Sequence, residues 1–257
     1  MPESRRDDLL AWFAAEVDDD TFIGRGGKFL GEVGRAEREA LATGDFHLPP
    51  DPFRGDGPES EVDAHLYYRM FWRMFDRSPV AMIQGIAIPV RLILAKKLFR
   101  HCGDDVIIHH DVLFSDGGNI SLGDGVLVNR YAMLDDRGPI DVGPYTMLSA
   151  GITIETHTHP FDNFEKPIAH AGRGLAPVRI GPNSVVGYNA VIMAGVTLGH
   201  RTIVGANSVV TKDVPDYTVV GGVPARVIKE VRPPDGHDPV REALERGATG
   251  TTGAEVP

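Results

Sequence analysis

The sequence ETHTHPFD, at residues 155–162, places two histidines, His157 and His159, on either side of a threonine and directly before Pro160. An imidazole in such a stretch can serve as a general base near neutral pH, as a metal ligand, or as a polar group at the end of a strand. The pair follows a run of β-branched residues, which favours a strand before it. The elements that position the two rings therefore decide between the three roles.

Beyond Cys102, aliphatic residues recur every six positions. The pattern contains three runs with this step: Leu122, Val128 and Leu134; Val142, Leu148 and Ile154; and Ile180, Val186, Ile192, Leu198, Val204 and Val210. Repeats of six residues are typical of parallel β-helices, in which three short strands close one coil of about eighteen residues. A coil buries its aliphatic residues only against neighbouring coils, so several coils must stack. An ordinary β-sandwich would show a period of two instead.

The expected fold class is mainly β: a left-handed parallel β-helix of hexapeptide repeats with an N-terminal helical region. We assign residues 1–105 to the helical region, 106–231 to the β-helix, and 232–257 to a short helix and a flexible tail. Within the first part, DAHLYYRMFWRMFDRS at 63–78 carries apolar residues at helical spacing. The tail loses the six-residue period and becomes polar and glycine-rich, which favours disorder.

The most apolar segment of the chain lies at residues 79–99. Gln84, Pro89 and Arg91 interrupt it, so its uncharged run is too short to span a bilayer. We expect a buried or interfacial helix here. A peripheral position on a membrane surface is the alternative.

Two breaks interrupt the six-residue register. Two extra residues separate Leu134 from Val142, around the sequence DDRGPI. A much longer segment separates Ile154 from Ile180, and it contains the paired histidines together with several prolines and glycines. This segment must leave the β-helix as a loop. Loops on a rigid scaffold commonly carry functional residues, so the histidines lie where function is expected.

Composition excludes several classes of function. The formal net charge is -10 and the isoelectric point is near 5.4, which argues against a surface devoted to nucleic acid. The single cysteine, Cys102, cannot form an intrachain disulfide and fits a reducing compartment, so we expect a cytoplasmic protein. The N-terminal sequence has charges where a secretion signal needs an apolar core.

The stretch THPFD, followed by VTKDVP and GGVPARVI in that order, resembles the hexapeptide acyltransferases, in particular the maltose and galactoside O-acetyltransferases. The resemblance covers about residues 106–231. It implies an acyltransferase that moves an acyl group, expected to be acetyl, from acetyl-CoA or another acyl-CoA to a hydroxyl of a sugar or another small acceptor. Members of this family are trimers with active sites between neighbouring prisms, so the resemblance also implies a homotrimer.

The resemblance assigns different roles to the two histidines. The family's catalytic residue is the histidine directly before proline, which here is His159. It acts as a general base that takes the proton of the acceptor hydroxyl, and the acceptor oxygen then attacks the thioester directly. His157 is expected to be its structural neighbour on the acceptor side.

Further acceptor-side residues follow from the same resemblance. Asn129 matches an asparagine that precedes the acceptor-site loop. Tyr131 replaces the family's next acceptor-contacting asparagine, which leaves the identity of the acceptor open. Asp135 and Asp136 fall in the same turn, and we assign them to binding sugar hydroxyls or orienting the imidazole.

The resemblance also assigns the residues that bind the cofactor, by matching positions of this sequence to those of the family. The expected residues are Tyr188, Ala206, Thr211, Lys212, Arg226 and Lys229. Tyr188 stands where a serine near the thioester is usual, and Ala206 matches an alanine whose backbone contacts the pantetheine arm. The TK pair lies near the nucleotide, and the last two cations face the CoA phosphates. An acidic protein that binds a polyanionic nucleotide needs such local cations.

Three alternatives remain open. An N-acyltransferase for an amino sugar would use the same cofactor residues. A metal-dependent β-helical hydratase would need a ligand beyond the pair, and His109, His110 and His170 are available. Histidines of that class are more widely spaced than this pair, so we expect no metal. A non-catalytic scaffold is the third alternative. Whatever the function, we expect the N-terminal helices to cap the prism; covering the acceptor pocket and docking a partner are the alternatives.

Overall fold

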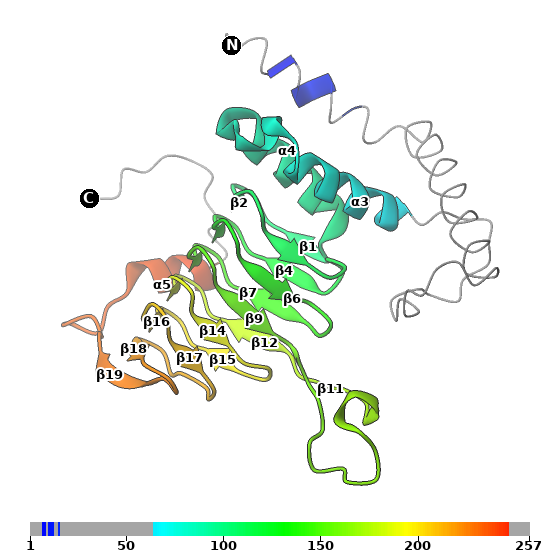
Figure 1. Cartoon of the computed structure of the whole chain (residues 1–257). Helices are drawn as coiled ribbons and strands as arrows, with labels where there is room; N and C mark the ends of the chain where they lie inside the picture. Colours follow the sequence, from blue (N-terminus) through cyan, green and yellow to red (C-terminus); the bar gives the residue numbers. More distant parts are fainter. Residues whose placement is uncertain (1–6, 9, 13–14, 16–63, 247–257) are drawn as a thin grey trace. The chain divides into compact units, whose positions relative to one another are not determined.

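The computed structural model describes residues 7–8, 10–12, 15 and 64–246 (Figure 1). Most of the predicted N-terminal region and the end of the predicted tail therefore lie outside the described residues. The chain divides into two compact units, Met1–Leu98 and Phe99–Pro257, which are described separately below.

The first unit contains the helices α3 (Ala64–Asp76), η1 (Pro79–Met82) and α4 (Gln84–Leu98). The α4 helix continues through Pro89, although proline donates no backbone hydrogen bond. Arg91 of α4 is 1% exposed, and its Nη2 lies 2.6 Å from the Asp76 carboxylate and donates to the Ala81 carbonyl at 3.0 Å. A buried guanidinium requires such partners. None of the described helices could span a lipid bilayer.

The second unit is a stack of coils whose strands form three parallel sheets, here called faces 1, 2 and 3 (Figure 1). Face 1 consists of β1 (His101–Cys102), β4 (Ile120–Leu122), β7 (Ile140–Val142), β12 (Val178–Ile180) and β15 (Thr197–Leu198). Face 2 consists of β2 (Ile107–Ile108), β5 (Leu127–Val128), β8 (Met147–Leu148), β13 (Val185–Val186), β16 (Ile203–Val204), β18 (Thr218–Gly221) and the antiparallel β19 (Arg226–Glu230). Face 3 consists of β3 (Leu113–Phe114), β6 (Met133–Asp135), β9 (Thr153–Glu155), β14 (Val191–Ile192) and β17 (Val209–Val210).

The aliphatic residues of the six-residue register form columns inside this stack. On face 2 the column is Ile108, Val128, Leu148, Val186, Val204 and Val220, all buried. Each such side chain contributes about 1.5–3 kcal/mol relative to an exposed position. The predicted parallel β-helix of hexapeptide repeats is therefore confirmed.

Coil length changes along the stack, and the change is located at one edge. Partners on face 1 are 20 positions apart early in the stack, as in His101 and Ser121, but 18 apart for Arg179 and Thr197. The partners Asp141 and Arg179 are 38 positions apart. The additional residues lie between face 3 and face 1, which we call edge 3–1. Both breaks in the sequence register fall on this edge.

The helix α5 (Pro239–Glu245) is attached to the β-helix by a buried carboxylate. Asp238 is the N-cap residue and accepts hydrogen bonds from the backbone N–H groups of Val240 and Arg241 at 3.1 Å each. Its other oxygen lies 2.9 Å from Nε2 of His200, and both side chains are nearly inaccessible to solvent. Burial alone would raise the pKa of the Asp238 carboxyl. The hydrogen bonds to His200 and Arg241, with the positive charge of His200 and Arg201, outweigh burial and lower that pKa below its ordinary value.

We expect Asp238→Asn to lower the free energy of unfolding by about 1–2 kcal/mol at neutral pH, because asparagine keeps the helix cap but loses the charge-assisted bond to His200. A carboxyl with a lowered folded-state pKa stabilises the protein fully above its unfolded-state pKa, and this contribution is lost as the pH falls through the folded-state value. Urea unfolding at several pH values should show a constant difference above about pH 5 that shrinks below about pH 4. The exposed Asp105, replaced by Asn, is the matched control. A difference that persists undiminished in acid would contradict this assignment.

Candidate active site

The loop that carries the paired histidines leaves the prism at edge 3–1, after β9. At its base, the buried Thr156 ties neighbouring coils together: its hydroxyl accepts from the Gly138 N–H at 2.8 Å and donates to the Asp135 carbonyl. The following β10 (His157–Thr158) pairs antiparallel with β11 (Gly174–Leu175), so the loop departs as a two-stranded arm (Figure 1). The arm carries the short helix η2 (Ile168–His170). ETHTHPFD is thus the end of a coil strand and the start of this arm.

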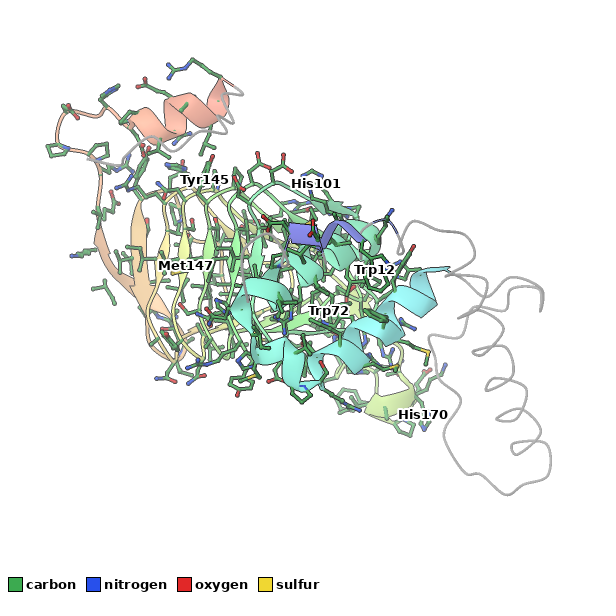
Figure 2. The ribbon with its side chains drawn as sticks, turned by 90° about the horizontal axis from the view of Figure 1, so that it is seen from above. Trp12, Trp72, His101, Tyr145, Met147 and His170 are labelled. Atoms are coloured by element: carbon green, nitrogen blue, oxygen red, sulfur yellow. The ribbon has the colours of Figure 1, made fainter. Side chains whose placement is uncertain are left out.

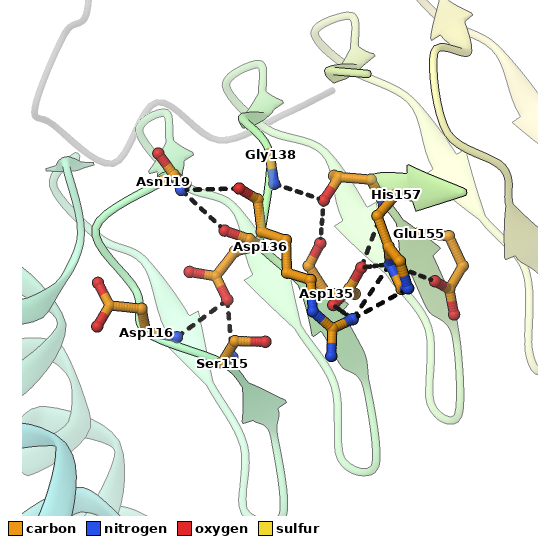
Figure 3. Close-up of polar contacts among 10 residues, drawn as sticks. Ser115, Asp116, Asn119, Asp135, Asp136, Gly138, Glu155 and His157 are labelled. Carbon is orange, nitrogen blue, oxygen red and sulfur yellow. Dashed lines mark hydrogen bonds and ion pairs between the residues drawn. The ribbon is translucent and has the colours of Figure 1, made fainter. Parts of the chain in front are cut away.

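The His157 ring uses both of its nitrogens (Figure 3). Nδ1 lies 2.5 Å from Oδ2 of Asp135, whose carboxylate is 3% exposed. Nη1 of Arg137 lies 2.5 Å from Oδ1 of the same carboxylate and 3.1 and 3.3 Å from the two ring nitrogens. The Asp135 carboxylate accepts from Nδ1–H, and the Arg137 guanidinium lies close to both ring nitrogens. The His157 ring is therefore held by two side chains.

The His159 ring is held on one side only. Its Nδ1 lies 3.2 Å from the carbonyl oxygen of Gly172, in the returning part of the loop. A carbonyl only accepts, so Nδ1 carries the proton and Nε2 keeps its lone pair. Gly172 has a φ of +92°, a conformation that favours glycine and lets this carbonyl face the ring. Among the described residues no hydrogen bond reaches Nε2, which leaves it available to accept a proton.

The sequence interpretation missed two members of this cluster, Arg137 and Glu155. Glu155 Oε2 lies 3.5 Å from Nδ1 of His157. Arg137 directly follows the two aspartates in the first register break, and Glu155 lies two positions before His157. Their place at the break was the available signal, because edge 3–1 brings the turn after β6 beside the end of β9.

The chemistry of the cluster also bears on metal binding. Ligand atoms of Asp135, Glu155 and His157 lie within 4.8 Å of one another in the described part of the chain. However, the Arg137 guanidinium contacts both Asp135 and His157. The cluster thus contains its own cation, and a metal ion would have to displace it.

Asp136 points away from this cluster and supports the preceding turn (Figure 3). It is 1% exposed, and its carboxylate accepts backbone hydrogen bonds from Ser115 at 2.7 Å, Asp116 at 3.2 Å and Gly117 at 2.6 Å. A buried carboxylate is stable when backbone N–H groups surround it in this way.

The other predicted acceptor residues lie on a different edge, between faces 2 and 3, here called edge 2–3. Asn129 and Tyr131 occupy the turn from β5 to β6 there. Tyr131 is 58% exposed, has a φ of +62°, and places its ring edge-to-face with His110 at 5.7 Å between centroids. Face 3 separates this turn from the paired histidines, so one prism does not bring the two groups together.

The predicted cofactor residues divide in the same way. Tyr188 and Ala206 occupy equivalent turns of adjacent coils on edge 2–3, and the Tyr188 carbonyl accepts from the Asn207 N–H at 2.7 Å. Thr211 and Lys212 follow β17 on edge 3–1, at the end of the stack. The pair of basic residues on β19, Arg226 and Lys229, is exposed at that same end.

Comparisons with known proteins agree with this architecture. Residues 177–212 match the family model described as bacterial transferase hexapeptide (six repeats). The galactoside O-acetyltransferase of Escherichia coli strain K12 is 32% identical over 145 residues, which cover 56% of this chain and 70% of that protein. The chain belongs to the hexapeptide-repeat acyltransferases.

Solved structures of this acyltransferase family are similar to the structure of this chain. A maltose O-acetyltransferase from Clostridium difficile 630 has a TM-score of 0.58 and 29% identity, covering 66% of this chain and 87% of that one. A hexapeptide-repeat acetyltransferase from Vibrio cholerae O1 biovar eltor, complexed with acetyl coenzyme A, has a TM-score of 0.59 and 28% identity, covering 70% and 94%. The predicted resemblance is confirmed.

In this acyltransferase we expect Asp136→Asn to lower the free energy of unfolding by about 2–3 kcal/mol, because an amide NH₂ would face backbone N–H groups that now meet a carboxylate oxygen. Thermal and urea unfolding of the purified variant measure the loss. The exposed loop carboxylate Asp162, replaced by Asn, is the control. Unchanged stability in the Asp136 variant would mean that its hydrogen bonds to the turn contribute little.

Proposed function

We propose that this protein is an acyl-CoA-dependent O-acyltransferase that acetylates a hydroxyl group of a sugar or a related small molecule. The observation that carries the proposal is which ring nitrogens of the two histidines have partners. In His159, Nδ1 donates to the Gly172 carbonyl, and Nε2 has no hydrogen-bond partner among the described residues. In His157, both nitrogens lie close to Asp135 or Arg137. Membership of a family that includes galactoside and maltose O-acetyltransferases supports the same reaction.

The proposal implies a direct transfer with one histidine as the base. Nε2 of His159 takes the proton of the acceptor hydroxyl while the acceptor oxygen forms a bond to the thioester carbonyl carbon. The carbonyl oxygen becomes an oxyanion, which backbone N–H groups along the coil stabilise. The carbon–sulfur bond then breaks, and the departing thiolate takes the proton from the His159 imidazolium. The products are the acetyl ester and CoA, and the histidine returns to its neutral form.

Acetyl-CoA fits as the acyl donor. The protein has a formal net charge of -10, so a polyanionic nucleotide needs a local patch of cations. Lys212, Arg226 and Lys229 are exposed near the end of the stack, and we assign them to the CoA phosphates. A solved relative holds acetyl coenzyme A. A reducing compartment such as the cytoplasm fits the single cysteine, and we include it in the proposal.

We further propose that the active site lies between subunits of a trimer. The predicted residues fall on edges 2–3 and 3–1, which face 3 separates within one prism. A cyclic arrangement brings edge 3–1 of one subunit to edge 2–3 of the next and completes the site.

The outer surfaces of the faces support assembly with further copies of this chain. On face 2 the outward residues Ile107, Met147 and Ile203 are 37%, 44% and 40% exposed, and Met147 is labelled on the strands in Figure 2. On face 3, Leu113 and Met133 are 58% and 45% exposed. Face 1 is polar instead, with Ser121, Asp141, Arg179 and Thr197 outward. Apolar side chains aligned on two faces are typical of an interface between subunits.

His159→Ala should reduce acetyl transfer by about 10²–10⁴-fold while acetyl-CoA still binds, because the variant loses proton abstraction but no cofactor contact. The assay supplies acetyl-CoA with methyl galactoside, maltose and glucose, and calorimetry measures CoA binding. Matched amino sugars in the same panel decide between oxygen and nitrogen as the attacking atom. If the wild-type protein binds CoA but acetylates only the amines, the reaction is N-acylation and the proposed O-acylation is wrong. Unchanged turnover in the variant would remove His159 as the base.

Met147→Lys should dissociate the trimer, because a buried lysine without a partner opposes assembly. Sedimentation of the wild type should give about three times the chain mass of 27.9 kDa, and the variant should approach that of one chain. Thr197→Lys, on the polar face 1, should leave the mass unchanged. A monomeric wild type would refute the proposed assembly.

A further inference from the structure

We infer that His157 is a positioning residue for His159: the Asp135–Arg137 pair clamps the His157 ring, and this ring holds the ring of the base. The inference rests on the proposed function, since it assigns a role relative to the catalytic base. It concerns residues that belong to this chain's own network of charges at edge 3–1 (Figure 3).

The loop alone provides little to fix the base. Among the described residues, the hydrogen bond of the His159 ring goes to Gly172, which belongs to the same loop. The loop side chains largely face solvent, with Phe161 80% and Phe164 95% exposed. A catalytic ring must be held to within a fraction of an ångström, because small misplacements cost large factors in rate. A second contact, from the prism, is therefore required.

His157 supplies that contact. Its ring meets the His159 ring edge-to-face, with centroids 5.5 Å apart and planes at 82°. The two residues are at alternate positions of an extended segment, so their side chains lie on the same side. On its other side, His157 is bonded to Asp135 at 2.5 Å, and Asp135 belongs to β6 of the prism. The contacts run without interruption from the rigid coil to the base.

Asp135, to which His157 is bonded, is itself held in place. The Asp135 carboxylate is 3% exposed, pairs with Arg137 at 2.5 Å and lies 3.4 Å from the Thr156 N–H. Formal charges in the cluster are negative on Asp135 and Glu155 and positive on Arg137. With neutral His157, the sum is one negative charge beside the ring that becomes an imidazolium during transfer. Opposite charge stabilises that state.

The test compares two substitutions of the same ring in the full-length protein. His157→Phe keeps an aromatic edge but cannot donate to Asp135, whereas His157→Asn keeps a donor near the Nδ1 position. We expect kcat to fall about 10–100-fold in the Phe variant, with KM for acetyl-CoA unchanged. The Asn variant should also lose kcat, because it keeps the donor to Asp135 but removes the ring that contacts His159. His170→Phe, which replaces an exposed histidine of the same loop, is the matched control and should keep wild-type kinetics.

A spectroscopic readout makes the inference independent of turnover. The ¹³C–¹H signal of the His159 ring, assigned by its absence in His159→Ala, should shift in His157→Phe and stay in place in His170→Phe. A Phe variant with wild-type kcat and an unshifted signal would overturn the inference, while the His159→Ala result would still decide the proposed function. Wild-type kcat in the Asn variant would also overturn it, because the ring contact to His159 would then not matter. Failure of the wild type to acetylate any acceptor would refute the proposed function, and the ring signal would still test the contact.

Discussion

The structure depends on the vertical alignment of aliphatic side chains inside the β-helix. Leu148 must lie above Val128 and below Val186, because each buries its surface only against the coils next to it. This constraint fixes the number of residues on each face. It leaves freedom at the edges, where a longer turn does not disturb the columns. In this protein the longer turns lie at edge 3–1. This edge contains the extra residues of the two 20-residue coils and the long loop.

Concentrating polar groups on one edge has an electrostatic cost, which specific partners offset. Asp135 and Asp136 are adjacent and both buried, an arrangement that isolated carboxylates would not tolerate. They face different ways: one receives Arg137 and His157, and the other receives three backbone N–H groups. The same turn therefore joins adjacent coils and holds the His157 ring beside His159.

Much of this could be predicted from the sequence. The six-residue register identifies the coils, and its breaks identify the edge where the loop leaves. The position of His159 before Pro160 and the resemblance to acyltransferases single out that histidine. The contacts within the Arg137–Asp135–His157 cluster do not follow from spacing alone, because its members are 2, 20 and 22 positions apart and meet through the parallel pairing of β6 with β9. The sequence also did not show that the predicted acceptor and cofactor residues lie on two different edges. Their order along the chain does not show which turns lie close together.

The two histidines show why residue type and spacing alone leave function open. Both are half-buried imidazoles on the same side of one extended segment, yet their chemistry differs because of what touches each nitrogen. Asp135 and Arg137 contact the His157 ring and hold it against the prism. A single carbonyl at Nδ1 of His159 sets its tautomer and leaves Nε2 available. Among the described residues, His159 thus differs from His157 in having one ring nitrogen, Nε2, without a hydrogen-bond partner.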